Sequence, residues 1–206
     1  MGFDYYAPQS FTDKNGNRVL IAWQNGWLWM PWCTDWGPTS QENWRGCMSV
    51  PRKVRLESAN NLCMYPVEEI ESLISQTITC KNVEISEKGF RICNDSNRSN
   101  RITLKLDIVK IESKNLEICV LRKESFYTAI QIDFLSKIIT LDKSFGDHYE
   151  GGRMNSSFEL HDNCLDLCIL VDHSSVEVYV NHGESCITTN VYPEENQIEC
   201  WIRTPY

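Results

Sequence analysis

LDLCILVDHSSVEVYVN, residues 165–181, restricts the fold more than any other stretch of the chain. Apolar residues occupy every second position on both sides of a polar Asp-His-Ser-Ser turn: Leu165, Leu167, Ile169 and Val171 before it, and Val176, Val178 and Val180 after it. Successive side chains of a strand point to opposite faces of a sheet. The alternation therefore predicts two antiparallel strands that share one buried face.

The same alternation recurs upstream, in RITLKLDIV at residues 101–109, LEICVLR at 116–122 and AIQIDF at 129–134. Turn residues separate these stretches, and none of the intervening segments is long enough for the helix of a βαβ unit. Short alternating strands at such intervals are typical of a sandwich or a barrel. We predict an all-β fold in which residues 76–206 form a β-sandwich or a β-barrel.

Residues 1–57 differ in character, because they hold six of the seven tryptophans. Two strand patterns, Tyr5–Phe11 and Arg18–Gln24, flank an Asp-Lys-Asn-Gly-Asn turn, and Asn-Gly is a strong hairpin signal. A third strand is predicted at Gly46–Leu56. It contains Pro51, which cannot donate to a ladder and indicates an edge position or a bulge.

Residues 58–75 are interpreted as a linker with a short helix. Pro66 precedes two glutamates, and acidic residues stabilise the first turn of a helix. Helical spacing would place four apolar residues on one face: Val67, Ile70, Leu73 and Ile74. We predict a connector here and no functional site.

Composition excludes several classes of partner. The formal charge of −8 over 206 residues disfavours binding to nucleic acid and to anionic membranes. No apolar run reaches the roughly 20 residues of a membrane span, and MGFDYYAPQ is not a signal peptide. The ten cysteines are scattered without a C-x-x-C pair, which favours buried thiols in a reducing cytoplasm over disulfides or a metal site. We expect a cytoplasmic protein without cofactors.

No phosphate-binding, dinucleotide, zinc-protease or serine-hydrolase motif occurs in the sequence. The histidines have no metal-ligand spacing, and His173 and His182 are expected to be solvated in turns. Asp142, Lys143 and Asp172 are interpreted as surface or turn charges. Aromatic residues beside polar ones can bind sugars, because sugar rings stack on aromatic faces and carboxylates bind hydroxyl groups, or they can simply form the core of a sheet. Both alternatives stay open for Asp4, Tyr5, Tyr6, Gln9, Trp23, Trp27 and Trp44.

Five stretches, in order along the chain, resemble one family. They are FDYYAPQSFTDKNGNRVLIAWQ at residues 3–24, WRGCMSVPRKVRL at 44–56, YPVEEIESL at 65–73, ITLDKSFG at 139–146 and ILVDHSSVEVYVNHGESCITTNVYP at 169–193. The family is that of the β-fructofuranosidases, glycoside hydrolase family 32, which includes invertases, sucrose-6-phosphate hydrolases and levanases. Lys143 stands where the family usually has Arg.

The resemblance implies that residues 1–57 correspond to the last blade of a five-bladed β-propeller and that a β-sandwich follows. The family cleaves fructosides with retention, using an Asp nucleophile and a Glu acid/base. Their motifs, W-M-N-D-P-N-G and E-C, and a third motif, R-D-P, lie upstream of the region that this chain resembles. We therefore predict no catalytic residue here. Asp4 and Tyr6 match the family's D-F-Y-A motif and are predicted to contact a fructoside, whereas Trp23 is expected in the core.

A lone blade would leave apolar surface exposed, notably Trp27, Trp29, Trp32 and Trp36. Apolar patches of that size are unusual on monomers. We expect this section to fold back on the sandwich, to become partly disordered or to pair with another chain. Self-association is the favoured outcome, and the partner would be a second copy or a separately encoded N-terminal half that completes the propeller. Two alternatives to an inactive hydrolase fragment stay open: a non-catalytic carbohydrate-binding module, and a structural subunit of a homo-oligomer or a propeller-bearing partner.

Overall fold

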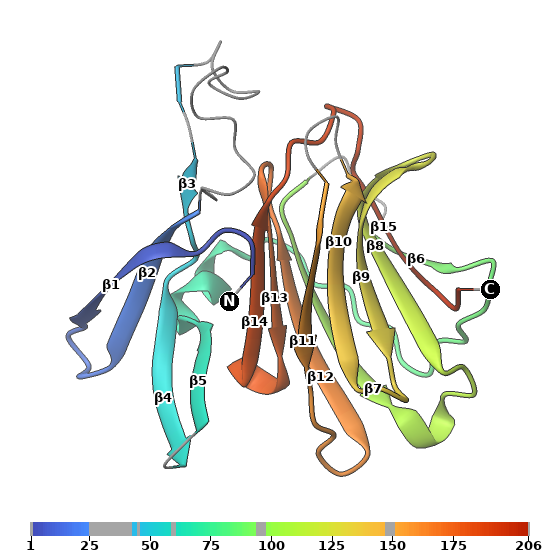
Figure 1. The fold of residues 1–206 in the computed structure, drawn as a ribbon, viewed down its shortest axis with the longest axis horizontal. Helices are drawn as coiled ribbons and strands as arrows, with labels where there is room; N and C mark the ends of the chain where they lie inside the picture. The colour runs from blue at the N-terminus through green and yellow to red at the C-terminus, as the bar shows by residue number, and fades with distance from the viewer. Residues whose placement is uncertain are drawn as a thin grey trace.

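A computed structural model describes residues 2–24, 43–44, 46–58, 61–93, 98–146 and 151–205. Within these ranges the strands form three antiparallel sheets in three layers (Figure 1). The N-terminal sheet lies at one side, a four-stranded sheet in the middle and a six-stranded sheet at the other side. The all-β prediction, a short piece of propeller-type sheet followed by a sandwich, is confirmed.

The N-terminal sheet has the order β1-β2-β4-β5, with the short β3 also pairing with β2. Its strands are β1 (Tyr6–Thr12), β2 (Arg18–Gln24), β3 (Cys47–Met48), β4 (Arg52–Ser58) and β5 (Asn61–Pro66). The β1–β2 turn forms as predicted, because Asp13 Oδ1 accepts hydrogen bonds from the backbone N–H groups of Asn15 and Asn17, both at 2.8 Å. Hydrogen bonds from Asn17 lower the pKa of Asp13. Gly16 supplies the positive φ that the turn requires.

The sandwich consists of the other two sheets. The four-stranded sheet has the order β14-β13-β12-β7, and the six-stranded sheet β11-β10-β9-β8-β15-β6. The strands are β6 (Phe90–Cys93), β7 (Asn100–Asp107), β8 (Asn115–Lys123), β9 (Phe126–Asp133), β10 (Ile138–Phe145), β11 (Arg153–Ser157), β12 (Cys164–Val171), β13 (Ser175–Val180), β14 (Ser185–Asn190) and β15 (Glu199–Arg203).

The core lies between the two sandwich sheets, where the predicted alternation places it. All seven apolar residues of the 165–180 hairpin pattern are buried in one cluster with inward residues of β7 to β10. Burying such side chains stabilises the fold by about 1.5–3 kcal/mol each. Members of the cluster from the four-stranded sheet include Ile102, Leu165, Leu167, Ile169, Val171, Val176, Val178, Val180 and Ile187, and members from the six-stranded sheet include Leu116, Ile118, Val120, Ile130, Ile132, Ile139 and Leu141.

The connector contains a strand that the sequence did not predict. β5 lies inside the stretch interpreted as a linker and pairs along the whole of β4. After it comes a 3₁₀ helix, η2 (Glu68–Leu73), with glutamates in its first turn as expected. The predicted apolar face is only partly covered: Val67 and Ile70 are half-buried, whereas Leu73 is 79% exposed. The domain boundary at residue 57 stays a prediction.

Two other expectations need correction. The predicted strand at Gly46–Leu56 is divided into β3 and β4, with Pro51 between them, since proline has no N–H for the ladder. Asp142 and Lys143 are buried instead of exposed. Asp142 accepts a hydrogen bond from Arg153 Nε at 2.7 Å, and Lys143 Nζ donates to the carbonyl of Asn190 and lies over the ring of Phe3. Both charges are thus compensated. His173 and His182 are exposed in turns, as predicted.

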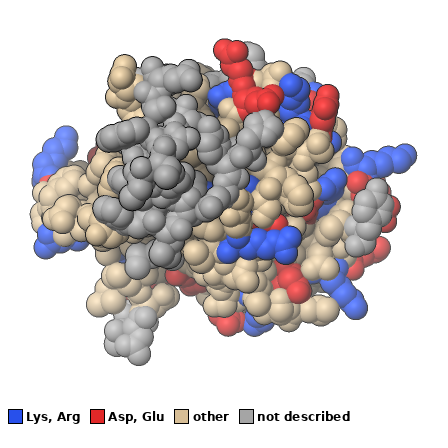
Figure 2. Space-filling model, turned by 45° about the horizontal axis from the view of Figure 1, so that its top comes forward, with Lys and Arg blue, Asp and Glu red and all other residues tan. Residues whose placement is uncertain are grey.

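Charged side chains of both signs are mixed over the face that Figure 2 shows. In the described part of the chain, no helix is long and apolar enough to cross a bilayer. Nine cysteines lie within the described ranges, and none of the nine is in a disulfide. Cys33, Trp27, Trp29, Trp32 and Trp36 lie outside the described residues, so the predicted tryptophan patch stays a prediction.

Candidate functional site

Asp4 lies at the junction between the N-terminal segment and the sandwich. Its carboxylate Oδ2 accepts hydrogen bonds from the backbone N–H of Asn190 at 2.7 Å and from Thr189 Oγ1 at 3.3 Å. Its own N–H donates to the carbonyl of Thr188. Asp4 is 0% exposed, so a ligand reaches this carboxylate only if the segment moves away from β14.

Tyr6, the second predicted contact residue, has the opposite environment. It is 48% exposed on β1, where its ring makes an edge contact with Trp23 at a centroid distance of 6.4 Å. Trp23 is half-buried and pairs with Tyr6 across β1 and β2. The structure thus places one predicted residue inside the junction and the other on an open sheet face. A substrate-binding role for Asp4 and Tyr6 stays a prediction.

A buried polar network joins the N-terminal sheet to the sandwich next to Asp4. Arg52 on β4 donates from Nη2 to Glu177 Oε2 on β13 at 2.6 Å, and both side chains are nearly inaccessible to solvent. Tyr179 donates to the same carboxylate, and Arg52 Nε donates to the Tyr179 hydroxyl at 3.1 Å. The other carboxylate oxygen of Glu177 accepts from Gln24 Nε2 and from the N–H of Val50. Glu177 is therefore the hub through which β2 and β4 hold β13.

The electrostatics of this network favour the ion pair. Burial alone would lower the pKa of Arg52, but the neighbouring Tyr179 and Glu177 outweigh burial, so the pKa is raised. Burial and the negative charge of Glu177 raise the pKa of Tyr179. The guanidinium thus stays charged and the phenol stays neutral. The sequence analysis missed this network, although Arg52 and Glu177 both lie in stretches that carry the family resemblance.

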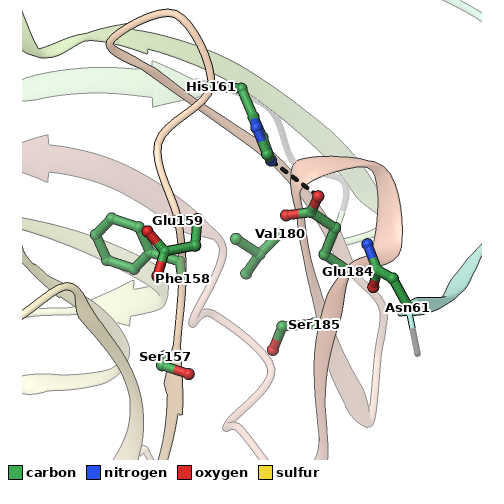
Figure 3. Close-up of a pocket in the computed structure, with 8 residues that line it drawn as sticks. All are labelled: Asn61, Ser157, Phe158, Glu159, His161, Val180, Glu184 and Ser185. Atoms are coloured by element: carbon green, nitrogen blue, oxygen red, sulfur yellow. Dashed lines mark hydrogen bonds and ion pairs between the residues drawn. The ribbon is translucent and has the colours of Figure 1, made fainter. Parts of the chain in front are cut away.

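A groove of about 350 Å³ opens beyond the junction, where the tip of the β4–β5 hairpin meets the sandwich (Figure 3). Val180 and Phe158 contribute the apolar part of its lining, and polar residues surround them: Asn61, Ser157, Glu159, His161, Glu184 and Ser185. Several of these polar groups already bond within the protein. His161 Nε2 lies 2.8 Å from Glu184 Oε1, and Lys137 Nζ donates to Glu159 Oε2 at 2.7 Å.

The His161–Glu184 pair should make stability depend on pH. The hydrogen bond to Glu184 raises the pKa of His161. Burial alone would raise the pKa of Glu184, but hydrogen bonds from His161 and Asn181 outweigh burial, so this pKa is lowered. The histidine contribution is complete below about pH 6.5 and is lost as pH rises through its raised pKa. The glutamate contribution is present above about pH 4.3 and is lost as pH falls through its lowered pKa. The pair therefore stabilises most between those values.

We expect an NMR titration to give His161 a pKa above about 6.5. Glu184→Gln should bring that pKa down, because the amide keeps the size of the side chain and removes its charge. Glu87→Gln is the control, because Glu87 lies far from His161. Glu87 precedes β6 at one edge of the six-stranded sheet, whereas His161 follows β11 at the other edge. An unchanged His161 pKa in Glu184→Gln would show that the pair does not form in solution.

The dipeptide Glu-Cys does occur in this chain, at Glu199–Cys200, but outside the position that the family resemblance gives it. Glu199 lies on β15 of the sandwich, where its carboxylate binds Arg91 and Arg122 and accepts a hydrogen bond from Trp201 Nε1. Retaining glycosidases need two carboxyl groups about 5 Å apart across a substrate. A carboxylate held by two guanidinium groups on the outside of a sheet does not supply that arrangement.

No group of three or more His, Cys, Asp or Glu side chains that could hold a metal ion gathers within the described ranges. Two polar clusters lie where the N-terminal sheet meets the sandwich: the junction network and the lining of the groove. The first joins two sheets, and the second is suited to hydrogen bonding with a polar ligand.

Comparison with known families gives two matches that together span nearly the whole chain. Residues 1–66 match the domain described as "Glycosyl hydrolases family 32 N-terminal domain". Residues 69–203 match "Glycosyl hydrolases family 32 C terminal". The change between the two matches falls after β5, so the N-terminal match contains the whole of the N-terminal sheet.

Curated relatives include the raffinose invertase of Escherichia coli, which is 31% identical over 194 residues. The sucrose-6-phosphate hydrolase of Staphylococcus xylosus is 30% identical over 202 residues. These alignments cover 94% and 95% of this chain but only 38% of each relative. The chain thus spans about two fifths of the length of these relatives.

Solved structures show the same fold. The chain superposes on sucrose-6-phosphate hydrolase from Lactobacillus gasseri with a TM-score of 0.74 at 22% identity, covering 98% of this chain and 39% of that one. Fructan 1-exohydrolase IIa from Cichorium intybus gives a TM-score of 0.78 at 19% identity, covering 99% and 46%. The arrangement of the N-terminal sheet against the sandwich is therefore shared with these two structures.

Proposed function

Because the chain belongs to glycosyl hydrolase family 32, we propose that it is the C-terminal part of an enzyme that hydrolyses β-fructosides, and that it does not catalyse hydrolysis alone. The observation that carries this proposal is the pair of family matches, at residues 1–66 and 69–203, within a chain that spans 38% of its relatives. In this role the sandwich would support a propeller, and a cytoplasmic location would suit the free thiols.

Catalysis with retention needs a nucleophile and an acid/base on either side of the glycosidic bond. The motifs W-M-N-D-P-N-G and R-D-P do not occur in these 206 residues, and the one Glu-Cys dipeptide lies on the sandwich. Asp4 and Tyr6 would then be substrate contacts only when the rest of a propeller positions a fructoside beside them.

The test is an assay of fructose release from sucrose, sucrose 6-phosphate and inulin with the purified chain at high concentration. We expect no release above background, because contacts without the acid pair bind at best. Reproducible release that co-purifies with the chain would contradict the proposal. Calorimetric titration with fructo-oligosaccharides is the second measurement, and saturable binding without hydrolysis would favour the carbohydrate-binding alternative.

The proposed partner covers the face of the N-terminal sheet that carries Tyr6, Phe11 and Met48, which the strand register places on one side. These large apolar side chains remain accessible to solvent. All seven residues of β1 are exposed, and β1 is an edge strand, which offers unpaired backbone groups to another chain. We propose that a second copy or a propeller-bearing chain covers this side. Light scattering should show a mass above that of one chain at high concentration, and Phe11→Glu should reduce it. Phe145→Glu is the control, because Phe145 is similarly exposed but lies at the end of β10 in the six-stranded sheet.

A further inference from the structure

Two cysteines face one another across the last two strands of the six-stranded sheet. Cys93 ends β6, Cys200 lies on β15, and the two are direct partners in the antiparallel register. Direct partners in such a pair have Cα atoms about 4.5 or 5.5 Å apart, depending on the hydrogen-bond pattern. Both separations fall within the range of about 4.4–6.8 Å that disulfides span. The register spacing of the pair is therefore compatible with a disulfide, although the register shifts directly after Cys200.

The side chains also point the same way. Cys200 is 1% exposed and belongs to the sandwich core, and the half-buried Cys93 packs against the same core cluster. The Cys200 thiol is in hydrogen-bonding contact with Cys93, and this contact together with burial raises the pKa of Cys200. Cys93 Sγ lies 3.8 Å from the carbonyl of Ile198, on the segment that leads into β15.

This juxtaposition distinguishes Cys93 and Cys200 from the other described cysteines. Of the nine, only these two are register partners of each other on adjacent strands. Cys168 and Cys186 share a row, but Tyr179 of β13 lies between them. Two strand spacings separate such residues by about 10 Å, which no disulfide bridges.

We propose that Cys93 and Cys200 are a disulfide-forming pair that closes when the chain meets a thiol oxidant such as glutathione disulfide, fixing the edge strand β6 to β15. Cys93, the more exposed thiol, attacks glutathione disulfide as its thiolate, forms a mixed disulfide and releases one glutathione. Cys200 then loses its proton and attacks the Cys93 sulfur, which releases the second glutathione. Two protein thiols are oxidised by two electrons, and one glutathione disulfide is reduced to two glutathiones.

The second step should be slow, because a buried thiol of raised pKa forms little thiolate. The disulfide should stabilise the attachment of β6 to the sheet. β6 has only four residues, and within the described chain β15 is its one neighbour, so it is the strand of this sheet with the least support. A bond closing a loop of about 100 residues removes much freedom from the unfolded chain, and we expect the Tm to rise by about 5 °C or more.

The test oxidises the intact chain with glutathione disulfide, blocks remaining thiols and digests it with trypsin and Glu-C without reduction. These proteases release residues 92–98 and 200–203, each with a single cysteine. We expect a linked peptide of these two segments, cleaved by dithiothreitol, and a Tm rise that the same reductant reverses. Absence of the linked peptide while Cys93 is alkylated or glutathionylated would overturn the proposal, as would a bond from Cys93 to another cysteine.

Two variants sharpen the result. Cys93→Ser should abolish both the linked peptide and the rise in Tm, with oxidised and reduced samples of the same variant compared so that any effect of serine on folding cancels. Cys80→Ser is the matched control. Cys80 is exposed and lies in none of the described strands, so it has no register partner. This variant should keep both signals, and their loss in Cys80→Ser would overturn the assignment.

Discussion

Replacing Glu177 by alanine is expected to lower the free energy of unfolding by about 3–5 kcal/mol, because it leaves the buried guanidinium of Arg52 without its counter-charge. The same change removes the acceptor for Tyr179, Gln24 and the N–H of Val50. Chemical denaturation measures the loss. Glu57→Ala is the control: its partner Arg55 is at a similar distance, 3.2 Å, but both side chains are about half exposed. Exposed pairs contribute at most about 1 kcal/mol, so this variant should change little.

A double replacement separates the cost of a broken pair from the value of an intact one. Arg52→Met combined with Glu177→Leu removes both charges and fills similar volume. Replacing a buried pair by apolar residues removes the cost of the unpaired guanidinium, so the double variant should recover part of the loss seen in Glu177→Ala. The rest of the loss should remain, because Tyr179, Gln24 and the N–H of Val50 still lack their acceptor. If the double variant were as unstable as the single one, the loss would come from these donors and not from the guanidinium. If Glu177→Ala cost less than Glu57→Ala, the junction would not be closed in solution.

Gly183→Ala is expected to cost about 3 kcal/mol, from backbone strain and overpacking together. Gly183 lies in the 3₁₀ turn η4 (Asn181–Gly183) with a φ of +96°, and a Cβ there would stand 2.2 Å from the carbonyl oxygen of Met64 on β5. The methyl group can fit only if β5 moves away from the sandwich. Hydrogen exchange should then increase at the amides of β5 as well as around η4.

Gly16→Ala is the matched control for this prediction. Gly16 also has a positive φ, +82°, but a Cβ added there would have no neighbour within 4 Å. Only the strain remains, which costs about 1–2 kcal/mol. Equal losses in the two variants would show that close packing of η4 against β5 contributes nothing to stability.

The strands of the sandwich could be predicted because one face of each sheet packs on the core and the other face is more exposed to solvent. In β7, Ile102 faces the core while Thr103 and Lys105 face outward, so local alternation records the burial directly. The hairpin of β12 and β13 repeats this pattern, and its apolar positions are all buried. The order of strands could not be obtained in the same way, since alternation specifies faces and not neighbours.

The junction could not be predicted from local pattern for a related reason. Glu177 and Tyr179 occupy the positions of β13 that alternation assigns to solvent, yet both are buried because the N-terminal sheet covers them. Their partner Arg52 is 125 residues away along the chain. A contact of that range leaves no period in the sequence. Asp4 and Tyr6 were selected by composition and by family resemblance, which give residue types and a motif but not the surroundings of the side chains.

The contact between Asp4 and Asn190 can form only late in the synthesis of the chain. The two residues are 186 positions apart. At about 5–20 residues per second on the ribosome, roughly 10–40 s pass between the appearance of the first and of the second. Throughout that interval the N-terminal sheet has no β14 to dock on. Side chains that the sandwich covers in the finished fold, among them Asp4 and Arg52, are then accessible to solvent and to chaperones.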